Sequence, residues 1–103
     1  MKRVVITGAG TVNALGHNVA DTLAAMREGR IGGQVRGFEA EGLYNRQQMS
    51  LYDRFTQFTL AAANEAITQS GLTFSGELSA KSGVVLGTAG GGVSTWDANY
   101  RSV

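Results

Sequence analysis

The chain contains no cysteine and no proline, and only one of its 103 residues is histidine. The lack of cysteine excludes a disulfide framework, cysteine-ligated zinc and a thiol nucleophile within these residues, and one histidine cannot form a His-rich metal site. Fifteen glycines accompany the lack of proline. Tight turns must therefore depend on the conformational freedom of glycine rather than on a preset φ.

Charge of one sign and long hydrophobic runs are also scarce. Nine Lys and Arg residues face eight Asp and Glu residues, which leaves a formal net charge of +1 and little support for a phosphate-driven nucleic-acid binder. No segment approaches the roughly 20 apolar residues of a membrane span. The apolar run near the N-terminus is too short for a signal peptide, so we expect a cytoplasmic protein. With 43% hydrophobic residues, the chain reads as one globular domain or a piece of one.

Two apolar, β-branched segments have the character of buried parallel strands, and a glycine-rich loop follows each. They are Arg3–Thr7 before Gly8-Ala9-Gly10, and Gly83–Leu86 before the loop Gly87–Gly92. A weaker strand is predicted at Gln34–Phe38. Helical spacing and capping residues predict a helix from about Asn18 to Gly29 and another from Asp53 to Ser70, with Ser50-Leu-Tyr-Asp53 as a capping box. A third helix is predicted from residue 94 or 95 through Tyr100.

The repeated strand–loop–helix order predicts an α/β protein with a largely parallel sheet. Two or three strands make an incomplete sheet, and no closing strand precedes the end of the chain. We therefore expect a fragment of a larger fold. The face of the Asp53–Ser70 helix is rich in alanine, so Phe58, Ala62 and Ala66 are expected to be largely buried under a closely packed neighbour.

The first glycine loop allows two interpretations. Gly8-Ala9-Gly10 resembles the start of a dinucleotide fingerprint, but the third glycine is missing, the helix starts late and no acidic residue closes a second strand. The loop Gly87–Gly92 lacks a Walker lysine, and close approach of another backbone or of an acyl chain is preferred to anion binding there.

No catalytic constellation is present in these residues. His17 is interpreted as a solvated loop residue, because no second histidine, cysteine or serine elbow accompanies it. Trp96 and Tyr100, four residues apart, are expected to be packing residues, and Arg54 a partner in an ion pair.

Three stretches together resemble the N-terminal part of the β-ketoacyl-acyl-carrier-protein synthases, the condensing enzymes of the thiolase superfamily. They are Arg3-Val-Val-Ile-Thr-Gly-Ala-Gly with Leu15-Gly16, then Asp53-Arg-Phe-Thr-Gln-Phe-Thr-Leu-Ala-Ala-Ala-Asn-Glu-Ala, then Gly83-Val-Val-Leu-Gly-Thr-Ala-Gly-Gly-Gly. The resemblance implies that residues 1–103 are the N-terminal segment of a ketosynthase domain. It implies a layered αβαβα fold, of which only the beginning of the first half is present.

The same resemblance implies a decarboxylative condensation of an acyl thioester with malonyl carrier protein, with no cofactor. An activated cysteine and two histidines would perform it, and all three would lie beyond Val103, so none of these residues is expected to be catalytic. The implied partners are an acyl carrier protein and a second ketosynthase-type subunit, in a homodimer or heterodimer.

Two residues carry site predictions through the resemblance. Gly90 matches a position beside the acyl pocket that often holds a branched apolar residue, so a more open pocket and a longer or polyketide chain are expected. Arg46 keeps one basic residue of a helix that meets the acidic carrier, while Gln47, Ser50 and Leu51 replace others. Between Gly32 and Gln34 the chain is shorter than the family pattern. Either the protein has a deletion here or some of its residues are left out of this sequence, and we favour the second explanation.

Two alternatives to a condensing enzyme stay open. A chain-length-factor-like subunit would share this segment, lack the catalytic cysteine and work only when paired with a true ketosynthase. A free-standing nucleotide-binding α/β domain is the second, and the incomplete fingerprint argues against it.

Overall fold

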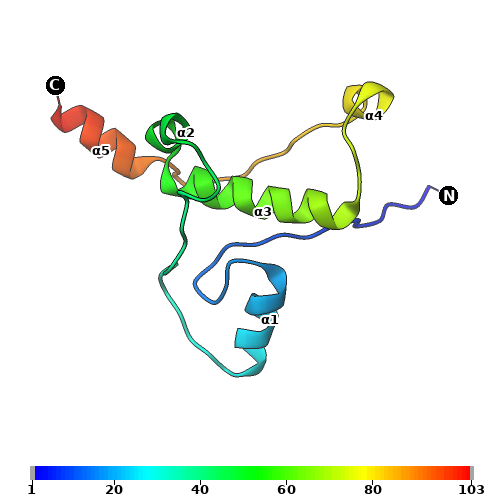
Figure 1. Cartoon of the computed structure of the whole chain (residues 1–103), viewed down its shortest axis with the longest axis horizontal. Coiled ribbons are helices and arrows are strands. Elements are labelled where there is room, and N and C mark those ends of the chain that lie inside the picture. The colour runs from blue at the N-terminus through cyan, green and yellow to red at the C-terminus, as the bar shows by residue number, and fades with distance from the viewer. Residues whose placement is uncertain (1, 103) are drawn as a thin grey trace.

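The computed structural model describes residues 2–102, in which helices are joined by long extended segments (Figure 1). The helices are α1 (Val19–Arg27), α2 (Arg46–Leu51), α3 (Arg54–Ser70), α4 (Gly76–Ala80) and α5 (Val93–Arg101). The longest, α3, runs through the centre of the molecule, with α1 on one side of it and α5 and α4 towards its two ends. None of these helices is long and apolar enough to cross a membrane.

The three helices predicted from the sequence are confirmed. Asn18 caps α1, because its side-chain oxygen accepts a hydrogen bond from the Asp21 backbone N–H, and α3 ends at Gly71, whose φ of 66° is left-handed. The capping box predicted at Ser50 is wrong. Ser50 lies inside α2, where its hydroxyl donates to the Gln47 carbonyl, and the true capping box belongs to α2.

The predicted strands are unpaired, and the one at 34–38 is bent at Gly37, whose φ is 68°. Residues 3–7 and 83–86 form no ladder, and residues 34–38 do not either; within residues 2–102 the only β-bridge joins Asn13 to Gly16. Val4 is 98% exposed and Val85 101% exposed. The physical reason is that a strand needs a partner for its backbone N–H and C=O groups, and α3 separates these two segments in Figure 1.

The chain is open rather than compact. Its radius of gyration is 16.5 Å, against about 13 Å for a compact domain of 100 residues. Its accessible surface is 8686 Å², where a compact monomer of this mass would expose about 5,500 Å². The buried residues are Ala25, Phe38, Ala40 and Gln57. The fold therefore has a small core beside α3 and leaves much apolar surface uncovered.

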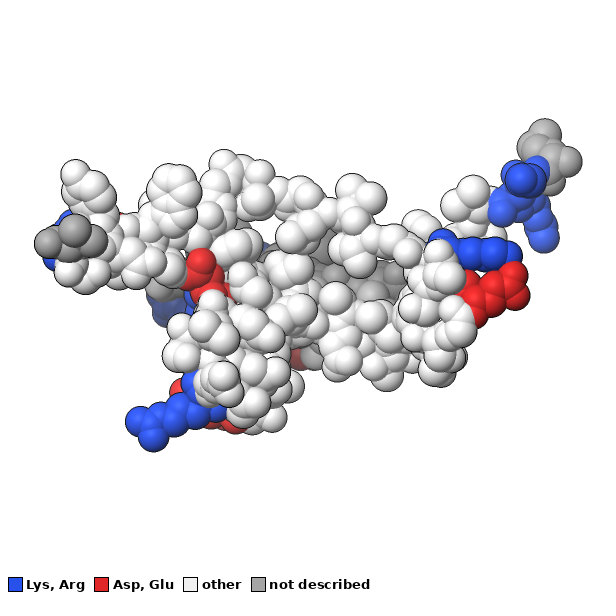
Figure 2. Space-filling model, turned by 90° about the horizontal axis from the view of Figure 1, so that it is seen from above, with Lys and Arg blue, Asp and Glu red and all other residues white. Residues whose placement is uncertain are grey.

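Two burial predictions need correction. Phe58, Ala62 and Ala66 are half-buried rather than largely buried, because the glycine segment covers only part of α3. Trp96 and Tyr100 do not pack: they are 80% and 86% exposed on α5, which extends away from the rest of the chain (Figure 1). Figure 2 shows that charged side chains on one face lie mainly towards its ends, so the middle of this face, above α3, is largely uncharged.

Candidate functional site

The first glycine loop lies directly on α3. A Cβ added to Gly8 would stand 2.0 Å from the Ala66 carbonyl oxygen, and one added to Gly10 would stand 1.8 Å from the Ala62 carbonyl oxygen. Only glycine permits this approach, because the obstacle is helix backbone rather than a flexible side chain. The first glycine loop is thus the closely packed neighbour that the alanine-rich face of α3 predicted.

Two backbone donors of this loop are occupied. The N–H of Ala9 donates to Gln69 Oε1 at 2.6 Å, and the N–H of Thr11 donates to Glu65 Oε2 at 2.9 Å. A dinucleotide site would need such donors free to meet a pyrophosphate, and a carboxylate beside them would repel it. The glycines serve helix packing, which argues against the nucleotide-binding alternative.

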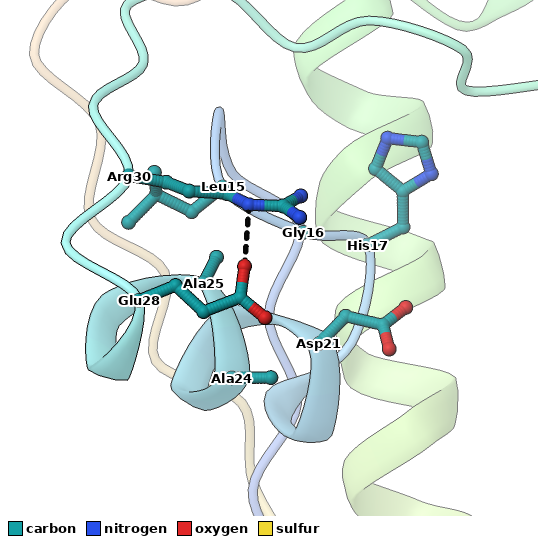
Figure 3. A pocket seen from close by; sticks show the side chains of 8 residues that line it. All are labelled: Leu15, Gly16, His17, Asp21, Ala24, Ala25, Glu28 and Arg30. Carbon is teal, nitrogen blue, oxygen red and sulfur yellow. Dashed lines mark ion pairs between the residues drawn. The ribbon is translucent and has the colours of Figure 1, made fainter.

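His17 lies at the rim of a hollow beside α1 (Figure 3). The hollow holds about 320 Å³ and is lined by Leu15, Gly16, His17, Asp21, Ala24, Ala25, Glu28 and Arg30. Arg30 pairs with Glu28 at 2.7 Å, and both side chains are more than half exposed. His17 Nε2 lies 2.7 Å from the Arg36 carbonyl oxygen, and its ring meets Phe38 edge-on. His17 is thus a loop residue as predicted, but it is half-buried and held by these contacts rather than solvated.

The second glycine loop forms a hollow with the start of α3. This hollow of about 350 Å³ is lined by Asp53, Arg54, Phe55, Phe58, Gly90, Gly91, Gly92, Val93 and Ser94. A Cβ on Gly91 would stand 2.6 Å from the Phe55 ring, and one on Gly92 would stand 2.9 Å from Asp53 Oδ2. The Thr95 hydroxyl also donates to Asp53, so α5 is attached to the first turn of α3.

Gly90 differs from these two neighbours. No heavy atom lies within 4 Å of a Cβ built on it, although the residue borders the hollow. Its φ is 158°, a conformation that L side chains rarely adopt, so a substitution there strains the backbone even where the space is open. A side chain at this position would therefore meet space rather than packed atoms.

Arg46 is exposed at the first position of α2. The capping box holds this short helix: the Gln48 N–H donates to Asn45 Oδ1 at 2.8 Å, and the Asn45 N–H donates to Gln48 Oε1 at 3.0 Å. No other residue of α2 is basic. The helix presents one positive charge rather than a basic face.

The loop before α2 is anchored to α3 through aromatic and amide groups. Tyr44 donates its hydroxyl proton to the Gln57 carbonyl oxygen at 2.8 Å, and the buried Gln57 side chain donates to the Tyr52 carbonyl oxygen. Burial, and secondarily the neighbouring Tyr52 phenol, raises the pKa of Tyr44. The result is a fixed platform for α2.

Arg54 has a different role from the predicted ion pair. Its guanidinium carbon lies 4.9 Å from the Phe58 ring centroid and 5.3 Å from the Phe38 ring centroid. Arg54 also donates to the Phe38 carbonyl oxygen at 3.3 Å. The stack joins α3 to the small core through cation–π contacts.

Glu65 and Gln69, which hold the first loop, are functional-site residues that were not predicted from the sequence. Their signal was a polar pair four residues apart, next to Ala62 and Ala66 on a face that should be apolar. Residues 2–102 contain no cluster of three His, Asp or Glu side chains that could hold a metal ion.

Comparison with known proteins gives several relatives of one kind. The chain is 32% identical to 3-oxoacyl-acyl-carrier-protein synthase 2 of a Synechocystis strain, over 89% of this chain and 26% of the relative. It is 26% identical to the enzyme of the same name from Staphylococcus aureus, and 30% identical to nodulation protein E of Rhizobium leguminosarum bv. trifolii, each over 99% of this chain and 29% of the relative. No protein-family model and no solved structure matches the chain.

The matched span also shows a difference in length. The Staphylococcus match extends over 119 residues, more than the 103 of this chain, so at least 16 positions of that relative have no counterpart here. The chain spans little more than a quarter of the length of these relatives. The predicted resemblance is confirmed: over nearly its whole length the chain is similar to part of the β-ketoacyl-acyl-carrier-protein synthases.

Proposed function

We propose that the chain is part of an acyltransferase that condenses an acyl thioester with malonyl carrier protein, in fatty-acid or polyketide synthesis. The observation that carries this proposal is the similarity to 3-oxoacyl-acyl-carrier-protein synthases over 89% to 99% of the chain. Residues 1–103 would be the N-terminal segment of the ketosynthase domain. The extended segments 3–7 and 83–86 would be strands of its layered αβαβα fold.

The segment contributes shape rather than catalytic groups in this proposal. It has no cysteine, and the ring of its single histidine is engaged by the Arg36 carbonyl and Phe38. The nucleophilic cysteine and the two histidines would lie beyond Val103. The enzyme would be cytoplasmic and dimeric, with a like or related ketosynthase subunit.

Gly90 would form part of the acyl-pocket wall. The hollow that it borders has Phe55 and Phe58 on its α3 side, and aromatic side chains suit an apolar chain. Because space surrounds the position of a Gly90 Cβ, glycine there leaves room that a branched residue would occupy. This supports acceptance of a long or bulky acyl chain.

The test substitutes Gly90→Ile in the complete enzyme, with Gly87→Ile as the matched control. Gly87 lies in the same loop, has no neighbour within 4 Å of its Cβ position and does not line the hollow. Gly90→Ile should lower kcat/KM for a long acyl carrier substrate at least tenfold while changing it less than threefold for a short one, which is more than about 0.7 kcal/mol of discrimination. An equal loss for both substrates with a large fall in melting temperature would reject the pocket, since it would indicate backbone strain alone.

A non-catalytic chain-length-factor-like subunit is the second candidate, and the composition of α2 favours it. Arg46 is the only basic residue of that helix, so direct docking of an acidic carrier is weakly supported. The discriminating experiment is condensation by the purified complete protein alone and after mixing with an active ketosynthase. Activity alone supports the enzyme, whereas activity only in the mixture supports the paired subunit.

A further inference from the structure

The segment before α1 and the start of α1 itself meet at one carboxylate. Glu65 Oε2 accepts the Thr11 N–H at 2.9 Å, and Glu65 Oε1 accepts the Val19 N–H at 2.8 Å. Val19 is the first residue of α1, so its N–H has no partner inside the helix. Both oxygens of one α3 side chain therefore bind backbone groups from parts of the chain 46 and 54 residues away.

No extensive helix packing supplements this contact. Within residues 2–102, no two helices pack against each other along their lengths. The remaining polar tie of α1 runs through the same loop: Asn13 Nδ2 donates to Thr22 Oγ1 of α1 and to Thr11 Oγ1, each at 3.0 Å. Since the Thr11 N–H is itself bound by Glu65, both of these connections from α1 reach α3 at the same carboxylate, and Gln69 holds the start of the loop separately through the Ala9 N–H.

The alternative attachment is aromatic. His17, two residues before α1, meets the Phe38 ring edge-on at a centroid distance of 5.6 Å, and Phe38 meets Phe58 of α3 at 5.0 Å. These ring–ring contacts join the residues before α1 to α3, and none of the three rings belongs to α1. A nine-residue helix is too short to persist in water without such support.

We infer that Glu65 is a positioning residue that latches α1 and the Gly8–Val19 segment to α3. A carboxylate suits this role because each oxygen accepts one N–H, and the positive end of α1 favours the negative charge. Glutamine has one acceptor oxygen and would direct its own N–H₂ group at the second donor. Loss of the latch should free α1 while leaving α3 intact.

The test is hydrogen exchange resolved to short segments, on the full chain at one concentration, with the oligomeric state of each variant checked by light scattering. Glu65→Ala should accelerate exchange in residues 19–27 at least tenfold and leave the middle of α3 unchanged. Glu65→Gln should preserve protection at only one of Thr11 and Val19. Asn64→Ala is the matched control, because Asn64 is the exposed neighbour on α3.

Two results would overturn the latch. If α1 exchanges at the same rate in Glu65→Ala as in Asn64→Ala, the aromatic contacts hold the helix and the carboxylate is dispensable. If exchange accelerates equally in α1 and along α3, Glu65 supports the whole core and has no specific positioning role.

Discussion

Replacing Gly10 with alanine is a severe test of how closely the first glycine segment packs on α3, because the added methyl group would stand closer to another atom than it would at any other glycine. The added Cβ would stand 1.8 Å from the Ala62 carbonyl oxygen, 2.8 Å from its carbonyl carbon and 3.0 Å from the Ala66 nitrogen. All three are atoms of the α3 backbone, which cannot rotate away as a side chain would. The segment must therefore lift off the helix.

The expected loss follows from what the displacement breaks. Overpacking alone is worth about 1 to 3 kcal/mol. Lifting the segment also stretches the bonds from Thr11 to Glu65 and from Ala9 to Gln69, and a bond to a charged acceptor contributes about 1.5 to 3 kcal/mol. We expect a total destabilisation of about 3 kcal/mol, and therefore a lower apparent melting temperature of the complete enzyme.

Thermal unfolding followed by far-ultraviolet circular dichroism measures this, at one chain concentration because association shifts the transition. The control is Gly42→Ala: no atom lies within 4 Å of its Cβ position and its φ is not positive, so we expect no loss and a gain of up to about 1 kcal/mol. Equal melting temperatures for the two variants would refute the close packing of Gly10 on α3.

Two further predictions concern association and partner binding. Isolated residues 1–103 should self-associate rather than persist as a folded monomer, because the unpaired apolar residues Val84 and Val85 are 93% and 101% exposed. Val85→Lys should reduce the mass measured by light scattering. A cooperative thermal transition in a monomeric sample would contradict the predicted self-association. Arg46→Ala should weaken the binding of acyl carrier protein to the complete enzyme only a few-fold, and only at low salt, because the charge is exposed. If Arg27→Ala weakened binding equally, the effect would come from overall charge and not from a carrier site at Arg46.

Helices were predictable from this sequence because their signals are local. Phe58 and the alanines after it mark one face of α3, and Asn18 marks the start of α1 by its capping bond. The short helix α4 went unpredicted, because five residues carry no apolar period. Local signals were misleading at Ser50, where a capping pattern lies inside another helix.

Strands and long-range contacts were less predictable because they depend on partners distant in the chain. Residues 3–7 have strand composition, yet an extended segment becomes a strand only when another pairs with it, and residues 2–102 supply none. Glu65 reads as an ordinary polar residue of a helix face, and its two partners lie 46 and 54 residues away. Composition predicts the conformation of each segment better than it predicts what that segment meets.

The two glycine loops share a pattern but differ in physical purpose, and the difference bears on the candidate pocket. Gly8 and Gly10 are needed because helix backbone lies against them, and Gly91 is needed because the Phe55 ring lies 2.6 Å from the position of its Cβ. Gly90 has no such neighbour, although it borders the same hollow as Gly91. Packing therefore constrains Gly91 but not Gly90, where a side chain would meet backbone strain from the φ of 158° rather than neighbouring atoms. A side chain at Gly90 lies at the rim of an apolar hollow, so its size can alter the hollow without detaching α5 from α3. A residue that determines the length of the accepted acyl chain needs this property.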